Sequence, residues 1–175
     1  EKYLLELNGR YDGSSSFRPG KQWAFFSSAS AGYRISEENF MKNVSWIDNM
    51  TLRLSYGQLG NDGLDSYYAW QSFYDLTWAN ANNPGALVSS LENTEVSWEK
   101  KGTWNVGVES TMFNHFLTFS AEYYNSLTTD MLLEYPMALS TGFSGYDANV
   151  GSMRNHGFEA SFRFNWIEKH KFGAS

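Results

Sequence analysis

The stretch "GFEASFRFNW", residues 157–166, sorts aromatic and polar side chains by parity. One parity holds Phe158, Ala160, Phe162, Phe164 and Trp166, and the other holds Glu159, Ser161, Arg163 and Asn165. Successive side chains of a strand point to opposite faces, so this pattern predicts a β-strand with one aromatic face and one polar face. The fold then depends on whether the aromatic face meets a protein core or lipid.

The same alternation recurs along the chain and predicts an all-β protein of about seven strands. The other segments are residues 3–11, 23–34, 52–57, 104–109 and 117–123, and a further strand begins in "KFGAS" at 171–175. The chain opens inside such a segment, without an initiator Met or any targeting segment. We therefore expect it to be a piece of a longer protein.

The composition excludes several classes of protein. Aromatic residues make up 18% of the 175 residues, yet the mean hydropathy is only -0.48. No run reaches the 18 or so apolar residues of a membrane helix, whereas a barrel strand needs only about 10 alternating ones. Zero Cys excludes a disulfide framework and thiolate metal sites. The net charge of -6 offers no basic patch for a phosphate backbone, so we expect no nucleic-acid partner.

The predicted connections differ in length in a regular way. The first, third and fifth are long and rich in Gly, Ser, Asn and Asp, at residues 13–21, 61–96 and 135–148, whereas "FNH" (113–115) and "EKH" (168–170) are tight turns. In an antiparallel up-and-down sheet, long loops and short turns then gather at opposite ends, as in outer-membrane barrels. The segment 36–50 is the exception, and Ser36 predicts an N-capped helical turn near 36–43.

Alternation alone also fits a soluble β-sandwich. Two features favour lipid: the polar faces hold small Ser, Asn, Thr and Gly residues, and Trp and Tyr gather near strand ends, as in the aromatic girdles of membrane barrels. The side chains that we expect to face lipid are Leu117, Phe119, Phe158, Phe162, Phe164 and Trp166.

A series of motifs in order resembles the C-terminal barrel region of the SusC/RagA-type TonB-linked outer-membrane proteins of the Bacteroidetes. They are "DGSSSF" (12–17), "WAFFSSASAGYRISEENFM" (23–41), "LRLSYGQLGNDG" (52–63), "SWEK" (97–100), "WNVGVE" (104–109), "TTDMLL" (128–133), "TGFS" (141–144) and "NVGSMRNHGFEASF" (149–162). The resemblance covers nearly the whole chain.

This resemblance implies that residues 1–175 are part of one transmembrane β-barrel domain, about a third of a 22-stranded plugged transporter. The plug and the N-terminal parts are absent from this sequence, and residues 61–96 form a long extracellular loop. The implied function is the wall of an outer-membrane importer of glycans, oligosaccharides or peptides. The implied partners are a SusD-like surface lipoprotein, the TonB–ExbB–ExbD energising complex, reached through the missing N-terminal parts, and outer-membrane lipid.

The residues offer no catalytic constellation, so we expect neither enzyme activity nor a cofactor. The three His residues lack ligand spacing, and "NDGLD" (61–65) does not match a calcium loop, so we expect no metal site. Aromatic residues crowd the stretch 67–78, where flat rings can stack on sugar faces. The candidate substrate-binding residues are Tyr67, Tyr68, Trp70, Tyr74 and Trp78. The alternative is that these rings only pack the loop.

Two other functions stay open at this point. One is a soluble carbohydrate-binding β-sandwich that uses the aromatic residues of 67–78, and a monomeric, cooperative melt without detergent would favour it. The other is a small outer-membrane barrel adhesin or enzyme of about eight strands. The identity of the cargo is not encoded in these residues alone, because one scaffold carries many substrates.

Overall fold

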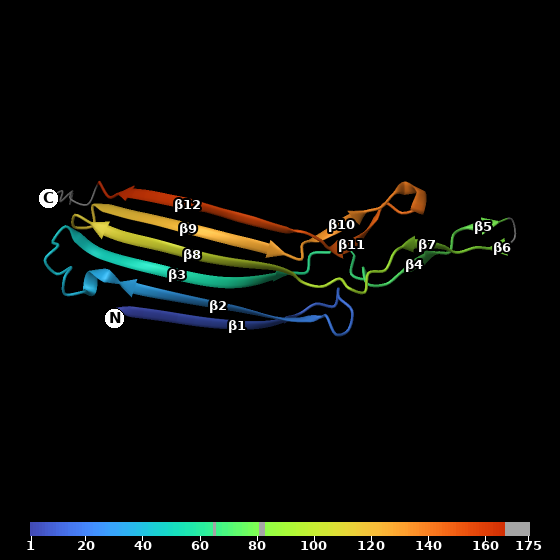
Figure 1. Cartoon of the computed structure of the whole chain (residues 1–175), viewed down its shortest axis with the longest axis horizontal. Coiled ribbons are helices and arrows are strands. Elements are labelled where there is room, and N and C mark those ends of the chain that lie inside the picture. The colour runs from blue at the N-terminus through green and yellow to red at the C-terminus, as the bar shows by residue number, and fades with distance from the viewer. Residues whose placement is uncertain (65, 81–82, 167–175) are drawn as a thin grey trace, which may run out of the picture.

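The computed structural model describes residues 1–64, 66–80 and 83–166. Six long antiparallel strands form one sheet in the order β1-β2-β3-β8-β9-β12, so that neighbours in sequence are neighbours in space (Figure 1). Their bounds are β1 Tyr3–Gly13, β2 Trp23–Arg34, β3 Ile47–Asn61, β8 Glu99–Met112, β9 Leu117–Thr129 and β12 Ser152–Phe164. The predicted up-and-down topology is confirmed. The expected strand at 171–175 lies outside the described residues.

The long connections carry structure of their own. Within 62–98, β4 (Phe73–Asp75) pairs with β7 (Leu87–Ser90), and β5 (Ala79–Asn80) pairs with β6 (Asn83–Pro84). Within 130–151, β10 (Leu132–Pro136) pairs with β11 (Gly145–Asn149) around the 3₁₀ turn η2 (Leu139–Thr141). We call the first hairpin pair, residues 73–90, the long arm, and the second, residues 132–149, the short arm. Both arms project from the sheet at the end opposite the N-terminus (Figure 1).

The short connections lie at the other end, as predicted. β8 and β9 are joined by residues 113–116, where Phe113, Asn114 and His115 all take positive φ. Side chains from neighbouring segments hold this turn: Asp48 Oδ2 accepts from the His115 amide at 2.8 Å, and Asn165 Nδ2 donates to the His115 carbonyl at 2.7 Å. The predicted turn "EKH" at 168–170 lies outside the described residues.

The predicted N-cap at Ser36 is wrong. The 3₁₀ turn η1 (Ile35–Glu37) begins one residue earlier, its N-cap is Arg34, and no side chain caps it. The Ser36 hydroxyl instead donates to Asn49 Oδ1 on β3 at 3.1 Å. Ser36 lies inside the turn rather than before it, and its side chain is bonded to the neighbouring strand. Further single turns follow, in which the Met41 amide donates to the Glu38 carbonyl and the Val44 amide donates to the Met41 carbonyl.

The sheet is a single layer, and this corrects the β-sandwich alternative. In the described part of the chain, the buried hydrophobic residues are Phe17, Phe26, Ala69, Val96, Trp98 and Ala148, all near the end that carries the arms. No described segment forms a second layer over either face in the middle of the sheet, and Phe158 is 68% exposed and Phe162 63%. No helix of the described residues is long and apolar enough to cross a membrane.

Candidate functional site

The register places the apolar positions of all six strands on one face, which we call the apolar face. For example, Leu5 lies opposite Ala31, Ala31 opposite Leu54, Leu54 opposite Val106, Val106 opposite Tyr123 and Tyr123 opposite Phe158. Residues directly opposite in a ladder point to the same side of the sheet. The expected lipid-facing residues of β9 and β12, Leu117, Phe119, Phe158, Phe162 and Phe164, all share this face.

Aromatic rings mark one boundary of the apolar face, and that boundary slants. Tyr11 is the outermost ring on β1, near the loop-bearing end. A row is the set of residues that lie directly opposite one another across the six strands. Tyr56 on β3 and Trp104 on β8 lie in the row of Leu7, four residues further from the loop-bearing end than Tyr11. Tyr123 on β9 and Phe158 on β12 lie in the row of Leu5, six residues further from that end. Beyond Phe158 the same parity of β12 turns polar, with His156 and then Arg154.

The other boundary of the apolar face shifts in the same direction. On β1 it ends at Tyr3, whose ring stacks on Tyr33 at 5.2 Å. Tyr3 lies in the row of Ala160, yet apolar residues on β12 continue to Phe164, four residues further, and Trp166 follows two residues later. Ring contacts of Phe116 with Phe164 and Trp166, and of Trp46 with Phe113, continue the aromatic belt.

Both boundaries therefore shift by about six residues over the five steps from β1 to β12. Six residues extend about 20 Å along a strand, and five strand spacings extend about 24 Å across the sheet. The apolar band is therefore inclined, and the strands are tilted by about 40° from the normal of the band. Strands of membrane-spanning barrels are tilted by about 35–45°. The height of the band is comparable too: Tyr3 and Tyr11 are separated by about 27 Å along β1, which at this tilt is about 21 Å along the band normal, close to the apolar band of about 25 Å in such barrels.

The opposite face, which we call the polar face, is lined by small hydrogen-bonding side chains. Thr103 Oγ1 donates to Ser126 Oγ at 2.9 Å, Asn105 Nδ2 donates to Ser55 Oγ at 3.3 Å, and the hydroxyls of Ser120 and Ser161 lie 2.8 Å apart. A hollow of about 550 Å³ on this face is lined by residues of β1, β2, β3 and β8. The polar face is thus concave and rich in hydrogen-bonding side chains.

Charges on the polar face are only partly balanced. Arg53 on β3 forms an ion pair with Glu109 on β8. On the next two strands, Glu122 of β9 and Glu159 of β12 lie directly opposite each other in the register, and both are exposed. Like charges in opposite positions repel, and the nearest cation in the row of Glu122 is Arg53, which lines the same hollow as Glu122.

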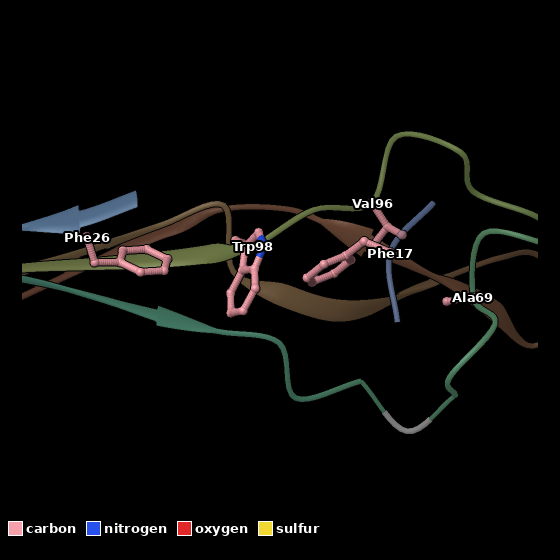
Figure 2. Close-up of a cluster of buried hydrophobic side chains, with 5 residues drawn as sticks. All are labelled: Phe17, Phe26, Ala69, Val96 and Trp98. Atoms are coloured by element: carbon pink, nitrogen blue, oxygen red, sulfur yellow. The ribbon is translucent and has the colours of Figure 1, made fainter. Parts of the chain in front are cut away.

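A compact cluster, which we call the collar, joins the sheet to its long connections. It consists of Phe17, Phe26, Ala69, Val96 and Trp98 (Figure 2). The Trp98 ring lies between Phe26 and Phe17, at centroid distances of 5.6 Å and 5.4 Å. β2 and β3 stop pairing at Ser28 and Gly57, and beyond that point the Phe26 ring occupies space that a side chain on Gly60 would fill. The collar thus ties β2 to the first and third connections.

Side-chain bonds to the backbone tie the connections to one another. The Trp98 indole donates to the Gln22 carbonyl at 3.1 Å. The Asn149 side chain, at the base of the short arm, accepts from the Ser97 amide and donates to the carbonyls of Ser97 and Asp130. The bonds to Gln22 and Ser97 satisfy partly buried backbone groups and so give the collar a fixed geometry. Sequence reasoning missed the collar, although Phe26 departs from its strand's parity and so offered a signal.

A surface ion pair reinforces the collar. Lys21 Nζ lies 2.7 Å from Glu95 Oε2 and 2.9 Å from the Glu95 carbonyl. The hydrogen bond from Lys21, and then its charge, hold the pKa of the Glu95 carboxyl below its ordinary value of 4.5. On the long arm, the amide and hydroxyl of Thr77, with the Trp78 indole, hold the pKa of Asp75 below its ordinary value.

The shift at Glu95 predicts a pH dependence of the collar. A carboxyl whose pKa is lower in the folded state stabilises that state above its ordinary pKa, and the contribution is lost as the pH falls through the lowered value. We therefore expect the protection of amides near residue 95 against hydrogen exchange, measured relative to their intrinsic rates, to fall as the pH drops below the ordinary value of 4.5. In Glu95→Gln this extra acid sensitivity should be absent. Equal acid sensitivity in both proteins would contradict the assignment.

The structure separates the five predicted substrate-binding residues. Tyr67 and Tyr68 lie in the turn before the long arm, Tyr74 lies on β4, and Trp78 follows β4, all of them exposed. Trp70 instead packs against the collar and is half-buried. The Tyr68 ring contacts Phe73 at 6.0 Å, and the Trp78 indole donates to Asp75 at 3.2 Å. Within the described residues, no group of three or more His, Asp or Glu side chains is arranged to hold a metal ion.

Comparisons with known proteins agree with this geometry. A family model described as TonB dependent receptor-like, beta-barrel, matches residues 1–174. TonB-dependent receptor P39 of Formosa agariphila is 34% identical over 179 residues, 98% of this chain and 17% of that protein. TonB-dependent receptor SusC of Bacteroides thetaiotaomicron is 30% identical over 172 residues, 91% of this chain and 17% of SusC.

Among solved structures, the RagAB peptide importer in the "closed-closed" state matches with a TM-score of 0.87 at 29% identity. The match covers 98% of this chain and 19% of that chain. This chain therefore spans less than a fifth of the length of each of these relatives.

Proposed function

The chain belongs to the TonB-dependent receptor β-barrel family of the outer membrane, in its SusC/RagA-like branch, and from this premise we propose that it is a wall segment of an energised importer of large nutrients. Residues 1–175 would lie in a single barrel domain, of which the six described strands are one part. The relatives that it matches are named as receptors and importers.

One observation carries the proposal: the apolar face is a slanted band with the height and tilt of a membrane-spanning wall. A soluble sheet gains nothing from aromatic boundaries that shift together from strand to strand, whereas a bilayer requires the band to stay level while the strands tilt. Phe158, Phe162 and Phe164 are the most exposed large apolar side chains of β12, and together with Trp166, Leu117 and Phe119 they would contact acyl chains.

The polar face would line the interior of the barrel and meet a plug supplied by a part of the protein outside this chain. The concave hollow and its small hydroxyl and amide side chains support this role, because a hydrated interior must bond either water or a filling domain. The adjacent carboxylates of Glu122 and Glu159 would favour a basic residue of that plug. The energising TonB–ExbB–ExbD complex would act through parts that precede the barrel.

The arms would stand outside the cell, where a SusD-like surface lipoprotein covers the pore mouth. Residues 61–96 would then be an extracellular loop. The cargo that we propose is a glycan or oligosaccharide, since Tyr67, Tyr68, Tyr74 and Trp78 expose flat rings near the pore mouth. Trp70 would contribute to cargo binding only indirectly, by packing on the collar that holds the loops. A peptide is the second candidate, because a solved relative is named a peptide importer.

Uptake by cells tests this function directly. The full-length gene, with its neighbouring lipoprotein gene, would be deleted and restored in its host. We expect growth on one large nutrient, and uptake of its labelled form, to require both the gene and a functional TonB. Uptake that continues in the deletion strain, or that is indifferent to loss of TonB, would refute the proposal.

A further inference from the structure

The side of the sheet that carries the apolar face becomes basic beyond the aromatic boundary, toward the arms. On β8, Lys100 lies four residues beyond Trp104, and on β12, Arg154 lies four residues beyond Phe158, each with the parity of the apolar positions. At the strand tilt of about 40°, four residues rise about 10 Å along the band normal. The two cations therefore stand at the same height above the apolar band, on the headgroup side of the aromatic boundary.

Both cations line one hollow of about 320 Å³, which we call the basic hollow. Tyr56 and Trp104, two rings of the aromatic boundary, line it on the side of the apolar band. Gln58, Asn125 and Thr129 add uncharged polar groups, and the lining includes no Asp or Glu. The basic hollow is thus continuous with the apolar face at one edge and purely cationic in its charge.

The two cations have no counter-charge of their own. Among the residues that the structure describes, every ion pair involves other cations, and the side chains of Lys100 and Arg154 form no hydrogen bond. Their Cα atoms are two strands and two residues apart, which is about 12 Å, so the two long side chains can meet over one group. Such side chains lay their methylene stems along apolar surface and direct the charge toward the headgroups.

A neutral donor lies in the same hollow. The Tyr56 hydroxyl accepts a hydrogen bond from Gln58 Nε2 at 2.9 Å, and its own proton has no acceptor among the described residues. This hydroxyl lies over Gly102, where an added Cβ would be 3.4 Å from the oxygen. Phosphate oxygens accept charged and neutral donors together, and the planar guanidinium of an Arg matches them in bidentate geometry.

We propose that the basic hollow binds the phosphate of an anionic membrane lipid, whose acyl chains continue over the apolar face. The proposal rests on the membrane wall proposed above, in which the apolar face meets lipid. Lys100 and Arg154 would pair with the phosphate, and the Tyr56 hydroxyl would donate to it. Because the lining comes from β3, β8, β9 and β12, one bound lipid would bridge four strands near the base of the arms.

Competition between two lipids with the same acyl chains tests the proposal. The full-length protein in a neutral detergent would be titrated with an equimolar mixture of dioleoyl phosphatidylglycerol and dioleoyl phosphatidylcholine, and native mass spectrometry would count the bound lipids. Choline neutralises the phosphate charge, whereas glycerol leaves it uncompensated. Each Lys or Arg near an anionic headgroup contributes about fivefold to affinity, so we expect phosphatidylglycerol to bind about 25-fold more tightly at the first site. Inorganic phosphate should not displace it, because free phosphate makes no contact with the apolar face.

Variants locate the preference on the sheet. Lys100→Gln and Arg154→Gln should each reduce it about fivefold, and the double variant should abolish it. The matched control combines Lys101→Gln with Arg163→Gln, which removes two cations from the polar face of the same two strands, and it should keep the preference. All four side chains are exposed, so the urea midpoint of each variant in phosphatidylcholine vesicles should equal that of the wild type, which shows that the variants fold.

Four outcomes would overturn the headgroup site: a wild-type protein without the preference, a Lys100/Arg154 double variant that keeps it, a control that loses it, or displacement by inorganic phosphate. Loss of a co-purifying surface lipoprotein in the double variant would make the hollow a protein contact and overturn the site likewise. The importer function stands in all these cases if uptake still depends on TonB. Uptake that is indifferent to TonB overturns the function separately, without changing the lipid measurement.

Discussion

Phe162→Arg is expected to destabilise the membrane-embedded protein more than an Arg at any other position of β12. Phe162 lies midway between Phe158 and Trp166, at the centre of the apolar band on this strand, and its ring packs on Phe119 at 5.0 Å. A charge placed at the bilayer midplane of a barrel costs about 2–4 kcal/mol, and the cost falls to about 0–1 kcal/mol near the interfaces. Urea unfolding of the full-length protein in phospholipid vesicles would measure the difference.

Two comparisons make this prediction specific to lipid contact. Ser161→Arg places the same side chain on the polar face one residue away, at an exposed position beside the Ser120 hydroxyl, so a small change is expected. Phe158→Arg lies at the boundary of the band and should cost less than Phe162→Arg. If Ser161→Arg proved as destabilising as Phe162→Arg, the apolar face would not be the lipid face.

The sheet could be predicted from sequence because apolar and polar residues alternate along each strand and so identify its two faces. Once residues 157–166 alternate as they do, side-chain chemistry fixes which positions share a face, and the tight turn at 113–115 fixes the direction of the next strand. The strands are nevertheless longer than the alternating segments. β3 spans Ile47–Asn61 although its clear alternation covers only 52–57. Its ends are held by ladder bonds to β8, and those bonds depend on the partner strand rather than on local side chains.

The collar could not be predicted in the same way, because its contacts join residues far apart in sequence. Phe17, Ala69 and Val96 come from two loops, and only the folded sheet brings them together. The turn at 113–116 shows the same limit on a smaller scale. Three successive non-glycine residues with positive φ are individually unfavourable, and bonds from Asp48 and Asn165, which are distant in sequence, offset that cost.

Trp98→Ala is expected to release the pore-mouth loops while the sheet stays intact. The substitution removes a nearly buried ring that packs on both Phe17 and Phe26, and it removes the donor to the Gln22 carbonyl. Loss of a buried Trp typically costs about 3–5 kcal/mol. The collar is small, so this loss is comparable with its whole local stability, whereas the ladder bonds of the six strands do not involve Trp98. Hydrogen exchange should therefore quicken in residues 14–22 and 91–98 but not in β9 or β12.

Trp98→Phe provides the matched control, because it keeps an aromatic ring between Phe17 and Phe26 but removes the indole donor. Its expected cost is the smaller one of a single lost hydrogen bond, about 1 kcal/mol, with exchange in the same two loops only slightly faster. If Trp98→Ala instead lowered protection evenly across the sheet, the collar would be part of the barrel's global folding unit. A local response would mean that the arms are anchored to the wall by this cluster, so the stability of the pore mouth can change without disturbing the membrane-spanning strands.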